Sequence, residues 1–134
     1  MMTVNELSKR ENVSSDAIRY YTKTGLLKPS RDNSNGYKLY SMSDLKRLQF
    51  ILRAKTLGFT LSEIKQIFSA SEKSESPCTL VRQIITERIE SNKKHLDEAM
   101  RLQKRMIEAE KKWQTMPNAM PTGHSICHLI EKVT

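Results

Sequence analysis

Residues 3–25 read TVNELSKRENVSSDAIRYYTKTG, and this stretch decides the fold because it contains signals for two short helices and for the turn between them. Thr3 and Glu6 have the spacing of a capping box, which predicts the start of the first helix. Ser14 or Ser15 can cap the second helix, and the closing glycine can end it. The spacing therefore predicts a helix, a turn and a second helix.

The segment that follows predicts a small β-ribbon, or wing. Pro29 ends helical structure, and Asn35-Gly36 is the preferred dipeptide of a two-residue type I′ hairpin turn. The YKLY sequence that continues from this glycine alternates like a short strand. Two more helices are expected over residues 43–58 and 60–68, and both are expected to pack against the first pair.

One long helix is expected from about Pro77 to Trp113, where the next proline stops it. This helix is too long to pack within a compact domain. Its apolar residues recur in the 4-3 rhythm of an imperfect coiled coil, which favours a homodimer over a helix packed on its own domain. The residues in this rhythm are Val81, Ile85, Ile89, Leu96, Ala99, Met106 and Trp113.

The expected fold is therefore mainly α. A winged helix-turn-helix domain is expected over residues 1–75, a dimerisation helix over residues 76–113, and a loop with a short terminal helix over residues 114–134. The chain's 134 residues suit one ordinary domain, or a small domain with one extension. No apolar run approaches the roughly 20 residues that span a bilayer, and no signal peptide is recognisable, so a cytoplasmic protein is expected.

The charge of the chain favours a polyanionic partner. The formal net charge is +8, and residues 1–58 hold 11 Lys and Arg against 5 Asp and Glu, so most of the excess lies in the first part of the chain. The sequence has no glycine-rich phosphate loop, no nucleophile elbow and no HEXXH spacing, so an enzyme is not expected. Together with the expected helix-turn-helix and wing, this charge favours double-stranded DNA as the partner.

The second short helix carries the first candidates for DNA contacts. Arg19, Tyr20 and Tyr21 lie close together, and their guanidinium and phenol groups can reach base edges and phosphates. Either tyrosine can instead fill the core. Cations around a tight turn are typical of a wing that grips the DNA backbone beside the groove. The wing candidates are Arg31, Tyr37 and Lys38.

Residues 3–68 resemble the winged helix-turn-helix domain of MerR-type transcriptional regulators, through the ordered series IRYY, GLL, NGYKLY, DLKRLQFI and LGFTLSEI. The rest of the chain is similar to the dimerisation helix and metal-binding loop of the metal-sensing branch. The resemblance assigns Arg19 and Tyr20 to the recognition helix. It also implies DNA-binding roles for the three wing residues and for two further positions, namely Ser15 at a helix start and Lys55 as a basic backbone contact.

The resemblance also implies a mechanism. Regulators of this family bind a pseudo-palindromic promoter as homodimers joined by an antiparallel coiled coil. The dimer binds between two promoter elements whose spacing is too long for RNA polymerase. The regulator therefore acts on the polymerase indirectly, through the promoter DNA that both proteins bind. Effector binding bends and untwists the DNA, which makes specificity depend partly on DNA deformability.

The tail sequence GHSICHLIE concentrates donor atoms that suit a metal ion. The resemblance places Cys78 at the start of the dimer helix of one subunit and Cys127 in the loop of its partner. One loop cysteine of the family is missing, and His124 and His128 are its natural substitutes. The resemblance favours His124, because a histidine occurs nearby in zinc-sensing relatives, and only one of the two need bind the ion. Thiolate and imidazole donors suit zinc, cadmium, lead or mercury ions. Copper(I) is the weaker expectation, although Met116 and Met120 keep it open.

Other interpretations of the tail remain open. The two thiols can form a redox or electrophile sensor, with a disulfide across the dimer. An architectural DNA-binding dimer needs no effector at all. In the simplest case Cys127 is a small buried apolar residue and the histidines are ordinary tail residues.

Overall fold

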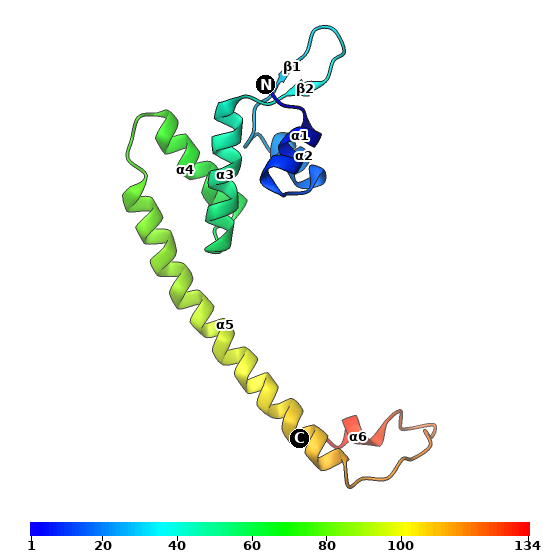
Figure 1. Ribbon diagram of the computed structural model, residues 1–134. Coiled ribbons are helices and arrows are strands. Elements are labelled where there is room, and N and C mark those ends of the chain that lie inside the picture. Colours follow the sequence, from blue (N-terminus) through cyan, green and yellow to red (C-terminus); the bar gives the residue numbers. More distant parts are fainter. The chain divides into compact units, whose positions relative to one another are not determined.

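The computed structural model describes all residues 1–134, and it is mainly helical, as expected. The chain forms two compact units, Met1–Thr86 and Glu87–Thr134. Helix α5 (Cys78–Trp113) begins in the first unit and ends in the second (Figure 1). No helix is both long and apolar enough to cross a membrane.

Helices α1 (Val4–Glu11) and α2 (Ser15–Lys23) form the expected helix-turn-helix. Thr3 and Ser14 are the N-caps, and each side chain accepts a hydrogen bond from the backbone N–H three residues later. Asn12 ends α1 in the left-handed conformation, with φ of 52°, which turns the chain toward α2. These local signals explain why the two helices were predictable from the sequence.

The wing consists of strands β1 (Ser30–Arg31) and β2 (Lys38–Leu39), which pair antiparallel (Figure 1). The expected two-residue turn at Asn35-Gly36 is wrong, because residues 32–37 all lie between the paired strands.

Asp32 is the physical reason for the longer turn. Its carboxylate accepts hydrogen bonds from the backbone N–H of Ser34 at 2.8 Å and from the Ser34 hydroxyl at 2.6 Å. Its carbonyl accepts from the N–H of Gly36 at 2.8 Å, so the chain begins to turn at Asp32. The Ser34 hydrogen bonds also lower the pKa of the Asp32 carboxyl. Gly36 supplies the positive φ that the end of this loop requires.

Helices α3 (Met42–Thr56) and α4 (Leu61–Glu72) pack against each other, and both begin with a complete capping box. The α3 box joins Ser41 and Asp44, so the helix begins at Met42, one residue before the expected start. Asp44 is buried and also accepts a hydrogen bond from the backbone N–H of Lys28 at 3.0 Å. This carboxylate therefore ties the start of α3 to the segment that leaves α2.

One hydrophobic core holds the first unit together. It joins all four of its short helices, the base of the wing and the first turns of α5. Burial of this much apolar surface stabilises the domain, at roughly 25 cal/mol per Å². The core residues are Leu7, Ile18, Tyr21, Leu26, Leu27, Tyr40, Leu45, Leu48, Ile51, Ala54, Phe59, Ile64, Ile67 and Ile84.

The second unit contains the rest of α5, a loop and the short helix α6 (His128–Glu131). The indole N–H of Trp113, at the end of α5, donates a hydrogen bond to the carbonyl of Leu129 at 3.0 Å. This hydrogen bond ties α6 back to the helix that precedes the loop. The second unit has no core of fully buried residues comparable to that of the first unit.

Candidate functional site

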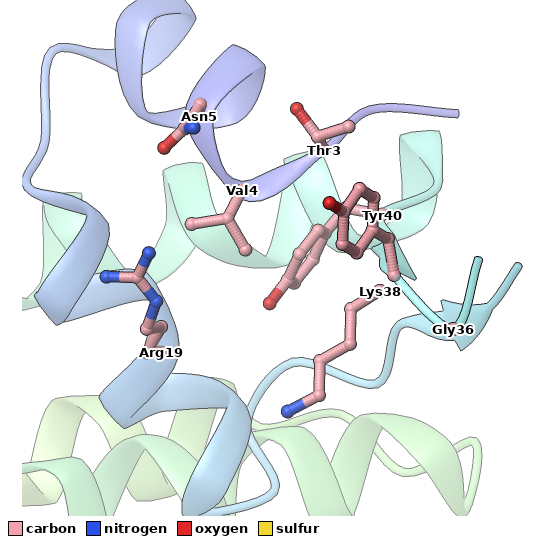
Figure 2. Close-up of a pocket in the computed structure, with 8 residues that line it drawn as sticks. Thr3, Val4, Asn5, Arg19, Gly36, Lys38 and Tyr40 are labelled. Atoms are coloured by element: carbon pink, nitrogen blue, oxygen red, sulfur yellow. The ribbon is translucent and has the colours of Figure 1, made fainter.

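A groove of about 490 Å³ lies in the first unit, between the start of α1, helix α2 and the wing (Figure 2). Arg19 borders it from α2 and Lys38 borders it from β2, so two cations from different elements face one space. The groove thus gathers three sequence candidates, because Tyr37 lines it as well. The lining residues are Thr3, Val4, Asn5, Arg19, Gly36, Tyr37, Lys38 and Tyr40.

The guanidinium of Arg19 is oriented but accessible. Its Nη1 lies 3.1 Å from the Asp16 carboxylate, one helical turn earlier on α2. The Arg19 side chain is 59% exposed and that of Asp16 is 96% exposed. An ion pair this exposed contributes little free energy, because solvent screens it. Arg19 can therefore exchange Asp16 for a base edge or a phosphate at small cost.

Tyr40 connects the wing to both of the elements that face it. The backbone of Tyr40 forms two hydrogen bonds with Met2, of 2.9 and 2.7 Å. Its hydroxyl lies 2.8 Å from the Thr22 hydroxyl on α2, and its side chain is fully buried. Tyr40 thereby fixes the base of the wing against α2. The sequence indicated only a strand residue here, because neither partner is near Tyr40 in the chain.

The start of α1 is a part of the groove that sequence reasoning missed. Thr3, Val4 and Asn5 line it, and a helix leaves its first backbone N–H groups without acceptors inside the helix. Such a terminus binds anions such as phosphate. Ser15 joins this region through its hydroxyl, which donates to the Asn5 side-chain oxygen at 3.4 Å. The spacing of Thr3 and Glu6 in the sequence marked the position of this terminus but not its neighbours, although in the structure only the Thr3 half of the expected capping box forms.

The two adjacent tyrosines of α2 have different environments. Tyr20 is 54% exposed, whereas Tyr21 is 6% exposed and belongs to the core. Burial raises the pKa of the Tyr21 hydroxyl, because it disfavours the charged form. Tyr20 is therefore the tyrosine that remains available for DNA, and Tyr21 fills the core.

Two basic candidates lie outside the lining of the groove. Arg31 pairs with Lys38 in the wing ladder and is exposed. Lys55 is exposed in the last turn of α3, just before the chain turns at Gly58. Both keep free access to solvent, which is what a contact to the DNA backbone requires.

The candidate metal ligands are divided between the two units. Cys78 begins α5 in the first unit, whereas His124, Cys127 and His128 lie in the second. Both thiols are free. The Nε2 atom of the His128 ring lies 2.8 Å from the carbonyl oxygen of Pro117. Within one chain, no three His, Cys, Asp or Glu side chains are placed to hold a metal ion.

Two family models match the chain. The model described as "MerR HTH family regulatory protein" matches residues 2–71, and the one described as "MerR, DNA binding" matches residues 45–109. The first match covers the helix-turn-helix, the wing and α4, which include every residue of the groove.

Individual proteins agree with these models. The HTH-type transcriptional regulator ZntR of Escherichia coli is 32% identical over 78% of this chain and 74% of its own length. The mercuric resistance operon regulatory protein of Bacillus cereus is 28% identical over 81% of this chain and 83% of its own. The crystal structure of a MerR family transcriptional regulator from Bacillus cereus superposes with a TM-score of 0.73, at 30% identity, over 89% of this chain and 87% of that one. The chain therefore belongs to the MerR family of DNA-binding transcriptional regulators.

Proposed function

We propose that this regulator binds a pseudo-palindromic promoter as a homodimer and activates transcription by distorting the DNA when a thiophilic metal ion binds. As a member of the family the chain is a regulator and not an enzyme. The groove bordered by Arg19, Lys38 and the start of α1 is the observation that carries the DNA-binding part of the proposal.

The groove residues divide naturally into two roles. Arg19 projects from the recognition helix and can donate two hydrogen bonds to a guanine edge in the major groove. Lys38 and Arg31 on the wing, Lys55 on α3 and the α1 terminus suit the phosphate backbone. The exposed rings of Tyr20 and Tyr37 can lie against sugar and phosphate. Phosphate contacts position the protein, and base contacts select the sequence.

The exposed face of α5 supports the homodimer. Successive residues of an α-helix are rotated by about 100° around the helix axis, so four apolar residues of α5 fall within an arc of roughly 40° on one face of the helix. All four are exposed in the single chain, and a helix of 36 residues with such a stripe suits a coiled coil. They are Ile89, Leu96, Met100 and Ile107, which we call the α5 stripe. The stripe adds Met100 and Ile107 to the apolar positions inferred from the sequence rhythm.

The donor set supports a metal effector, and a relative is named for mercuric resistance. Free thiols and imidazoles are the ligands preferred by zinc, cadmium, lead and mercury. Since one chain does not bring three such groups together, Cys78 of a second copy would complete a site formed by Cys127 and at least one of the two tail histidines, His124 and His128. The ion would then link the two subunits, which is how its binding can alter the dimer on DNA.

The test of this function is run-off transcription. The operator is first selected from random duplexes by the reduced, metal-free protein, and a promoter is built around it. Zinc, cadmium, lead, mercury and copper(I) are then added separately. We expect activation by at least one divalent ion. Activation by oxidants or electrophiles alone would instead show a thiol-based redox sensor, and no response to any effector would show an architectural DNA-binding protein.

Replacing Arg19 with alanine should weaken binding to the selected operator by about 10- to 100-fold, because a bidentate base contact is lost. Binding to unrelated duplex DNA should fall much less, so the specificity ratio should shrink. Competitive electrophoretic mobility shifts with both DNAs measure this ratio, and sedimentation shows that the dimer is intact. An unchanged ratio would remove Arg19 from sequence recognition.

Replacing Lys38 with alanine should lower affinity for operator and unrelated DNA alike. The slope of log K against log salt should fall by about one unit, as expected for the loss of one phosphate contact. Lys73→Ala is the matched control, because Lys73 is an exposed lysine at the end of α4 that does not line the groove. Equal slopes for the two variants would contradict a phosphate contact at Lys38.

A further inference from the structure

We propose that His128, acting through its Nδ1 atom, is the histidine ligand of the metal site beside Cys127, and that His124 is not a ligand. This assignment rests on the proposed metal-dependent function. It names the residue and the atom that bind, and it differs from the family resemblance, which favoured His124 as the substitute for the missing loop cysteine.

The hydrogen bond of His128 fixes which ring nitrogen is free. Its Nε2 lies 2.8 Å from the Pro117 carbonyl oxygen, and a carbonyl oxygen can only accept, so Nε2 carries the proton. A neutral imidazole has one such proton, which leaves a lone pair on Nδ1. Histidines that bind metals commonly donate their other ring N–H to a carbonyl group in this way. The hydrogen bond to Pro117 therefore favours, in the neutral ring of His128, the tautomer whose Nδ1 is free to bind an ion.

The backbone around Cys127 and His128 is held on both sides. The N–H of Ile126 donates to the Glu131 carboxylate at 3.1 Å, and the Leu129 carbonyl accepts from the Trp113 indole at 3.0 Å. The N–H of Glu131 also donates to the carbonyl of Cys127 at 3.1 Å. A thiol and an imidazole on consecutive residues are thus carried by an anchored backbone. Preorganised donors lose less conformational entropy when they bind an ion.

His124 lacks this support. It lies in a turn closed by the hydrogen bond from Thr122 to the Ser125 carbonyl, and its backbone N–H donates to the Thr122 hydroxyl. The residue is exposed, and no hydrogen bond restrains its ring. Binding of a metal by His124 would have to fix an exposed side chain that no hydrogen bond holds in place, with no carbonyl to select its tautomer.

Zinc affinity of matched variants tests the assignment. His128→Gln removes the imidazole but keeps an N–H donor that can reach Pro117, and His124→Gln is its control. Affinity is measured on the full-length, reduced homodimer by competition with a chromophoric chelator. We expect at least about 10-fold weaker zinc binding for His128→Gln, and a change within about twofold for His124→Gln. Circular dichroism verifies that both variants keep the wild-type helix content.

Ring-nitrogen chemical shifts give a second measurement that does not depend on affinity. In the metal-free protein labelled with ¹⁵N-histidine, we expect His128 to have a protonated Nε2 and a bare Nδ1, and zinc should shift Nδ1 while Nε2 keeps its proton. A protonated Nδ1, a shift at Nε2, or a larger loss of affinity in His124→Gln would overturn the assignment. If the wild-type dimer binds none of the ions, both the proposed metal-dependent function and the assignment of His128 as a ligand are wrong. If the wild-type dimer binds zinc but the two variants do not show the expected affinities, only the assignment of His128 is wrong.

Discussion

Cys78→Ser and Cys127→Ser are each expected to abolish metal-dependent activation while DNA binding survives. Each change removes a thiolate donor, and a metal site that loses one of its few protein donors should bind its ion at least about 10-fold more weakly. Neither residue belongs to the core, since Cys78 is exposed and Cys127 is partly exposed, so the fold should persist. Run-off transcription with a metal titration measures activation, and mobility shifts measure DNA binding.

A mixed dimer of the two variants tests whether the site is shared between subunits. If Cys78 of one chain and Cys127 of the other bind the same ion, a dimer of Cys78→Ser with Cys127→Ser has one site without thiols and one site with both. One ion should then bind per purified heterodimer, with an affinity close to that of the wild type. If both thiols of a site came from a single chain, each site would lack one. The absence of a restored tight site would therefore refute the shared site.

Leu96→Lys is expected to convert the dimer to monomers. Leu96 lies on the α5 stripe and is 56% exposed in the single chain, and the proposed coiled coil would bury it. The substitution places an unpaired charge from each chain in an apolar interface, at a cost of about 3–5 kcal/mol. Such a cost raises the dissociation constant by more than 100-fold.

Leu102→Lys is the matched control for this experiment. Leu102 is 53% exposed on the same helix, but it lies about 120° around the helix from Leu96, away from the α5 stripe. Analytical ultracentrifugation should show monomers for Leu96→Lys and dimers for Leu102→Lys. Dimers in both variants would place the interface elsewhere, and monomers in both would show that α5 associates through a broader surface.

The sequence by itself determined the helices of this protein, because their signals are local. Thr3 and Ser14 cap the first two helices, and Asn12 with its left-handed backbone separates them. Helix α5 extends over Cys78–Trp113, close to the expected bounds, because Pro77 lies just before it and Pro117 follows four residues after its last residue. The ordered motifs also identified the family, which the family models confirm.

The wing and the two tyrosines of α2 show where local signals were insufficient. The Asn35-Gly36 dipeptide favours a two-residue turn, but the carboxylate of Asp32 begins the turn earlier. Tyr20 and Tyr21 are alike in sequence, and only the packing of α2 on the core decides that the second is buried.

The groove was decided by the tertiary structure alone. Arg19 and Lys38 border one space because Tyr40 holds the wing against Met2 and Thr22, residues far from it in the chain. Likewise, the two tail histidines differ because the carbonyl of a distant proline accepts a hydrogen bond from only one of them. Helix caps act within three or four residues, and a sequence displays them directly. Contacts between distant residues depend on how the helices and strands pack, and the spacing of residues along the chain does not reveal this packing.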